Sequence, residues 1–109
     1  MNNKDIFVIL STCPDAATAE RLGRTLVEEA LAACVNVLPG LRSIYRWNDA
    51  VQCDEEALMI IKTTAACLAT ARERLVELHP YEVPEAVALP VVDGHHAYLS
   101  WVASSTRAP

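Results

Sequence analysis

The chain lacks the features that mark nucleotide-binding and nucleic-acid-binding proteins. Its 109 residues include only three glycines, which leaves little room for a glycine-rich phosphate loop, and no nucleophile elbow or HExxH motif is present. The nine lysines and arginines are scattered within a net charge of −5, which argues against a surface that follows phosphates. We therefore expect no nucleic-acid partner and no enzyme, although the sequence does not exclude catalysis.

Signals for export and membrane insertion are also missing. The apolar run at residues 6–10 is too short for a signal core or a membrane span. Four cysteines, at positions 13, 34, 53 and 67, contain no CxxC pair, and without an export signal they should remain reduced. We expect one soluble cytoplasmic domain over residues 1–109, with no membrane partner. Cys34, Cys53 and Cys67 are expected to be packing residues, because free cysteine is often buried.

Hydrophobic periodicity predicts the order β-α-β-β-α-β followed by a last helix. Thr12 and Asp15 resemble a capping box with Pro14 in the first turn, which predicts an amphipathic helix to about Ala33. The other predicted elements are strands at 6–10, 34–47, 51–64 and 86–92 and helices at 65–78 and 95–104. This is the α+β, ferredoxin-like plan, in which helices cover one face of an antiparallel sheet.

The second and third strands form an unusually long hairpin. Each has about fourteen residues, more than twice the usual length, with Asn48-Asp49 as the turn and Pro39-Gly40 as a bulge. A protruding ribbon exposes unpaired edges, so a symmetric homo-oligomer is the natural solution. The alternative is a mobile arm in a monomer, which would leave apolar side chains near the tip in water: Ile44, Tyr45, Trp47 and Val51.

Residues 79–85, between the second helix and the fourth strand, hold a dense set of polar groups. His79, Tyr81, Glu82 and Glu85 lie around two prolines, which stiffen the backbone in a non-helical conformation. Such a rigid connector is typical of a binding loop. The alternative is that proline only ends a helix and begins an edge strand.

Strand direction sorts the candidate metal ligands. We expect the first and third strands to lie side by side and point the same way, with the second and fourth running opposite at the two edges. Cys13 and His79 then meet at one end, with Cys34 near them, whereas His95 and His96 lie at the other. Thiolate and imidazole favour copper(I) or zinc, but a stable site needs three or four ligands, and one chain offers no complete set. We expect no metal role for His95 and His96.

Two charged residues of the third strand need partners if they are buried. Glu56 and Lys62 share a strand face but lie about 20 Å apart in extended chain, so they cannot pair with each other. Tyr81 or Glu85 of the connector is a suitable partner. The alternative for Lys62 is a hydrated side chain at a strand end.

Several segments together resemble one protein family. They are residues 31–40 (LAACVNVLPG), 43–47 (SIYRW), 61–64 (IKTT), 79–85 (HPYEVPE) and 98–101 (YLSW). In combination they are similar to the CutA family, the divalent-cation tolerance proteins, from about Ile6 to Trp101.

The resemblance implies a homotrimer, similar in plan to the PII signalling proteins, with long hairpins that join the sheets of different subunits. It also implies a cleft between subunits lined by recurrent family positions: Trp47, Glu56, Lys62, Tyr81 and Glu85. Copper-binding members can carry a thiol where this chain has Ser11 and paired histidines where it has Leu78 and His79. Here Cys13, two residues beyond Ser11, is expected to substitute, which gives Cys13 and His79 as the candidate copper ligands.

Two functions follow from these features. The first is a trimeric metal-tolerance protein that binds copper or another heavy-metal ion. The second is a PII-like regulatory or scaffold trimer that takes a small ligand or a partner protein in its cleft.

Overall fold

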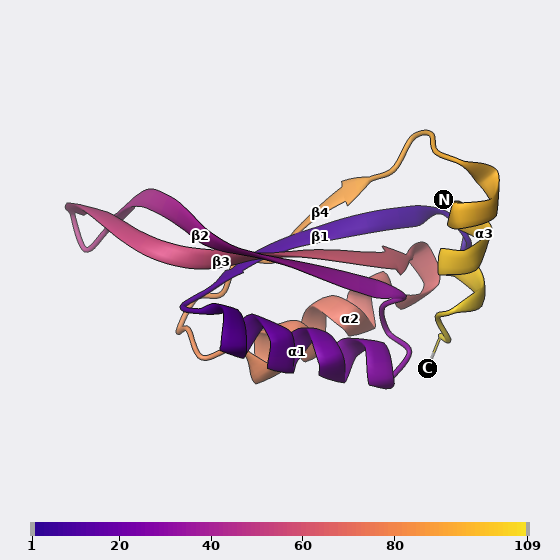
Figure 1. Ribbon diagram of the computed structural model, residues 1–109, viewed down its shortest axis with the longest axis horizontal. Coiled ribbons are helices and arrows are strands. Elements are labelled where there is room, and N and C mark those ends of the chain that lie inside the picture. The colour runs from indigo at the N-terminus through magenta and orange to yellow at the C-terminus, as the bar shows by residue number, and fades with distance from the viewer. Residues whose placement is uncertain (1, 109) are drawn as a thin grey trace.

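The structure, a computed structural model, describes residues 2–108 and confirms the predicted α+β plan (Figure 1). The four strands form one antiparallel sheet in the order β2-β3-β1-β4. The elements are β1 (Ile6–Cys13), α1 (Ala16–Glu28), β2 (Cys34–Trp47), β3 (Ala50–Thr64), α2 (Ala65–Leu78), β4 (Val87–Pro90) and α3 (His96–Ser104).

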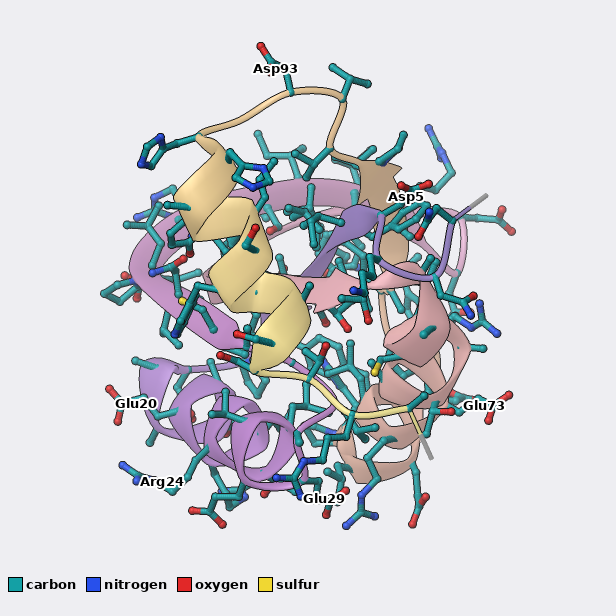
Figure 2. The ribbon with its side chains drawn as sticks, turned by 90° about the vertical axis from the view of Figure 1, so that its right-hand side faces the viewer. Asp5, Glu20, Arg24, Glu29, Glu73 and Asp93 are labelled. Carbon is teal, nitrogen blue, oxygen red and sulfur yellow. The ribbon has the colours of Figure 1, made fainter. Side chains whose placement is uncertain are left out.

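The main core lies between the sheet and two helices. Figure 2 shows α1 and α2 side by side on one face of the sheet, with Glu20, Arg24 and Glu73 pointing outward. Leu22 and Leu26 of α1 and Leu75 of α2 are buried against the side chains that β1 and β3 direct to this face. Alternate strand residues point to opposite faces, so every second residue of these strands enters the core.

Among the described residues, the other face of the sheet is covered only at one end, by α3, whose Val102 packs against Ile6. Apolar side chains continue along the rest of that face, where no part of residues 2–108 covers them fully. Leu10, Leu58 and Ile60 are half-buried there, and Leu38, Val87 and Leu89 are exposed. An apolar sheet face of this kind is typical of an interaction surface.

The hairpin of β2 and β3 extends beyond the rest of the sheet (Figure 1). The last residue of β1, Cys13, pairs with Ala57, so residues 50–56 of β3 pair only with β2. The predicted turn is confirmed, since Asn48 and Asp49 have φ values of 50° and 62°. The predicted bulge is confirmed by a register shift between Leu38 and Leu41.

The first helix begins and ends differently from the prediction. Asp15, not Thr12, is its N-cap, because the Asp15 carboxylate accepts a hydrogen bond from the Thr18 N–H at 2.7 Å. The helix ends at Glu28 rather than near Ala33, since Ala30 adopts a left-handed conformation with φ of 59°. The first strand is longer than predicted, because β1 continues beyond residue 10 to Cys13.

The predicted directions of the second and third strands relative to the first were wrong. β1 and β3 are antiparallel, because the crossover through α1 makes β1 and β2 parallel and the hairpin then reverses the chain. Cys34 therefore pairs with Lys62 and lies at the α3 end of the sheet, away from Cys13. The placement of Cys13 and His79 at one end does not depend on this error.

Candidate functional site

A groove of about 790 Å³ lies where the hairpin leaves the body of the protein. Four of the five predicted cleft residues line it, namely Trp47, Glu56, Tyr81 and Glu85. Five carboxylates and no lysine or arginine are among its lining residues, so the groove has a negative potential. These carboxylates belong to Asp54, Glu55, Glu56, Glu82 and Glu85.

Tyr81 and Glu56 form the best-defined polar contact of the groove. The Tyr81 hydroxyl donates to the Glu56 carboxylate at 2.6 Å, and Glu56 is only 7% exposed. This confirms the predicted need of Glu56 for a partner from the connector. Burial, together with the bond to Glu56, holds the pKa of Tyr81 well above its usual value, so the phenol remains a donor at neutral pH.

Lys62, the fifth predicted residue, does not line this groove. Its ammonium donates to the Tyr98 hydroxyl at 3.1 Å and lies 5.3 Å from the centre of the Tyr98 ring. Tyr98 belongs to α3, so this partner was missed by the sequence reasoning, which considered only the connector. The segment 98–101 carries the family resemblance, but that signal does not specify a contact with Lys62.

The structure brings the two candidate metal ligands together, as predicted. The Cys13 sulfur lies 3.6 Å from His79 Nε2, and both side chains are buried. His79 Nδ1 faces the Tyr81 backbone N–H at 3.1 Å. Because that group can only donate, Nδ1 accepts, and the ring proton is assigned to Nε2, which donates to the Thr12 carbonyl at 2.9 Å.

The Cys13 thiol is neutral in this environment. Burial first, and then the nearby carboxylates of Glu56 and Asp15, raise the pKa of Cys13 from 9.0 to about 11. The thiol donates to the Met59 sulfur at 3.4 Å. Met59 was missed by the sequence reasoning, because it is 46 positions from Cys13 and only the strand register brings the two together.

Other candidate ligands are dispersed. Across residues 2–108, no three side chains of His, Cys, Asp and Glu are close enough together to hold a metal ion. His95 and His96 are exposed at the start of α3. Of the three cysteines expected to pack, Cys67 is buried, Cys34 is half-buried and Cys53 is exposed. The prediction for Cys53 was wrong because it lies in the protruding part of β3, which the body of the chain does not cover.

None of the helices in the described range is long and apolar enough to cross a membrane.

The chain is similar to proteins of one family over almost its whole length. The family model described as "CutA1 divalent ion tolerance protein" matches residues 7–105. A "Divalent-cation tolerance protein CutA" from Thermus thermophilus is 48% identical and aligns with 91% of this chain and 96% of that protein. "Protein CutA, chloroplastic" from Arabidopsis thaliana is 43% identical, and the alignment spans 92% of this chain but 55% of that longer protein.

A solved structure agrees with this assignment. The crystal structure of CutA from Xylella fastidiosa has a TM-score of 0.92 and 45% sequence identity, and the match covers 94% of this chain and 99% of that one. Sequence and fold therefore give the same answer over the same residues. The chain belongs to the CutA family of divalent-ion tolerance proteins.

Proposed function

We propose that this protein acts in divalent-cation tolerance by binding copper, as copper(I), or another soft heavy-metal ion at Cys13 and His79. The observation that carries this proposal is the 3.6 Å separation of Cys13 Sγ and His79 Nε2. Thiolate and imidazole suit copper(I) and zinc better than magnesium or calcium, which prefer oxygen ligands. The names of the relatives, which refer to divalent-cation tolerance, support the same role.

The protons on both groups must move when an ion binds. The Cys13 thiol loses its proton to solvent, and the ring proton of His79 moves from Nε2 to Nδ1, which gives up the hydrogen bond from Tyr81. The acidic groove supports binding of the ion, because its five carboxylates attract cations to the neighbourhood of Tyr81. The Tyr81 ring lies 4.7 Å from the His79 ring, between centroids.

Titration of the reduced protein with copper(I), against a competing chromophoric chelator, tests the proposal. We expect Cys13→Ala and His79→Ala each to weaken binding. His96→Ala is the matched control, since His96 is an exposed histidine at the start of α3 and its loss should leave the affinity unchanged. Equal affinity of the wild type and both site variants would refute the role of this pair.

We propose further that the protein is a homotrimer. The apolar sheet face described above and the hairpin tip support this, because Ile44 and Val51 are 74% and 66% exposed in the single chain and such surfaces favour association. The number three comes from the family resemblance.

Light scattering on the protein as it elutes from a size-exclusion column tests the trimer. The expected mass is three times that of the 11.9 kDa chain. Ile44→Asp should reduce the mass. Val92→Asp is the matched control, because Val92 is 95% exposed but lies outside the hairpin. A wild-type mass equal to one chain would contradict the proposal.

A second candidate function is a PII-like regulatory or scaffold role, in which the groove takes a small ligand or a partner protein. The groove favours it, because Trp47 and Tyr81 supply apolar area beside hydrogen-bonding groups. A trimer that is indifferent to copper(I), with a ligand retained in the groove, would favour this role over metal binding.

We place both roles in the cytoplasm, since all four cysteines are free thiols. Cell fractionation tests this, and recovery in an oxidising compartment would overturn it.

A further inference from the structure

We propose that the Met59 thioether is a third ligand of the soft-cation site, beside Cys13 Sγ and His79 Nε2. This inference rests on the proposed function. It adds the third ligand that a stable metal site needs. Met59 is 0% exposed, as is Cys13, and the two sulfurs lie 3.4 Å apart.

The strand register fixes this contact. Met59 pairs with Ser11 and Ala57 pairs with Cys13 in neighbouring antiparallel strands, so Met59 is the diagonal neighbour of Cys13 on the face that α1 and α2 cover. His79 follows directly after α2, and its ring reaches Cys13 from the helix layer. Met59 and His79 therefore each contact the Cys13 sulfur from a different part of the fold, as enclosing an ion requires.

The separations are close to those that coordination needs. With metal–sulfur bonds of about 2.3 Å and metal–nitrogen bonds of about 2.0 Å, ligand angles of about 110–120° put sulfur and nitrogen roughly 3.5–3.7 Å apart and two sulfurs roughly 3.8–4.0 Å apart. The observed distances from Cys13 Sγ are 3.6 Å to His79 Nε2 and 3.4 Å to Met59 Sδ. Of these two pairs, the sulfurs have to separate by a few tenths of an ångström, and methionine has the flexibility for this.

The net charge of the three ligands matches a monovalent ion. Cys13 and Met59 are fully buried, and an uncompensated charge in such a place is costly. One thiolate, one neutral thioether and one neutral imidazole bring a single negative charge, so copper(I) leaves this ligand set neutral and zinc does not; the Glu56 and Asp15 carboxylates near Cys13 lie outside the set. Thioether is also a soft ligand that favours copper(I). The thiol proton leaves to solvent, so one proton is released for each ion bound.

An unpartnered hydroxyl lies next to this cluster. Among the described residues, Ser11 Oγ is the one buried side-chain nitrogen or oxygen without a hydrogen-bond partner, and Ser11 is directly opposite Met59 in the register. A buried polar atom of this kind often marks a place that an ion or a water occupies. The unpartnered Ser11 hydroxyl therefore supports an ion-binding position near Met59.

The methionine methyl signals test the inference without any substitution. The chain has two methionines, so methyl-labelled protein gives two signals, of which Met59→Leu identifies one. Added copper(I) should shift the Met59 signal in proportion to the ion bound, up to one equivalent. A Met59 signal that does not move while copper(I) binds would overturn the inference.

Affinity gives a second, independent readout. Met59→Leu conserves volume and should weaken copper(I) binding by at least about tenfold, the lower end of the cost of losing even an outer-shell partner. Ile61→Leu is the matched control, a buried substitution two residues along the same strand, and should leave the affinity unchanged.

The outcomes separate the two proposals. Wild-type protein that binds no copper(I) refutes the proposed metal function and this inference with it. Binding that depends on Cys13 and His79 but is the same in wild type and Met59→Leu refutes only the role of Met59.

Discussion

Replacing Tyr81 with phenylalanine removes one hydroxyl from the groove and leaves the ring in place. The structure assigns that hydroxyl to the Glu56 carboxylate at 2.6 Å, a distance typical of a hydrogen bond to a charged acceptor. Glu56 is 7% exposed, so water compensates the lost donor poorly. Hydrogen bonds to charged groups contribute about 1.5–3 kcal/mol, and we expect Tyr81→Phe to lower the free energy of unfolding by about that amount.

Urea unfolding at pH 7 and one fixed chain concentration measures this loss. Tyr45→Phe is the matched control, because the Tyr45 hydroxyl also donates to a carboxylate, that of Asp54, but on the exposed hairpin; its cost should be much smaller. In a Glu56→Gln background the cost of Tyr81→Phe should fall, since the charged acceptor is gone. Equal costs at Tyr81 and Tyr45, or no coupling to Glu56, would refute the assigned role of this pair.

Three further predictions concern the thiol, the helix packing and the hairpin turn. The pKa of Cys13 is raised from 9.0 to about 11, so the unfolded thiol ionises first and the thiol's contribution to stability is lost as pH rises. Without metal, the stability of the wild type relative to Cys13→Ala should therefore decrease by about 1.3 kcal/mol from pH 8 to pH 10 in urea unfolding, and a constant difference would contradict it. Gly23→Ala places a Cβ 2.9 Å from Val35 Cγ1 and should cost about 1–3 kcal/mol in the same assay; Val35→Ala should relieve this cost, and a harmless Gly23→Ala would show that the helix shifts freely. Asp49→Gly should raise the thermal midpoint, because Asp49 has a φ of 62° that glycine adopts without strain, and a lower midpoint would show that the aspartate side chain stabilises the turn.

The elements with the strongest local signals were predicted well from the sequence. The helix Ala65–Leu78 was placed at its observed bounds, and the turn at Asn48-Asp49 and the bulge near Gly40 were also predicted. Each of these depends on neighbouring residues alone, through periodicity or backbone preference. The end of α1 was placed too late because apolar spacing continues into residues 30–33, whereas Ala30 has a backbone conformation that no helix continues.

Contacts between distant residues were predicted less completely. Tyr81 with Glu56, and Cys13 with His79, followed from chain order and the family resemblance. Met59 beside Cys13 and Tyr98 beside Lys62 did not, because the first depends on strand register and the second on how α3 crosses the sheet. Cys34 was misplaced because the directions of the second and third strands were wrong, although the predicted helical crossover and hairpin together fix both.

X-ray absorption at the copper edge of the copper(I)-loaded protein tests the metal site most directly, because it counts the ligand atoms. Cys13, Met59 and His79 predict two sulfurs and one nitrogen around each ion, and two sulfurs should become one in Met59→Leu. A first shell of oxygen and nitrogen atoms alone would contradict the site and place any bound copper among the carboxylates of the groove instead.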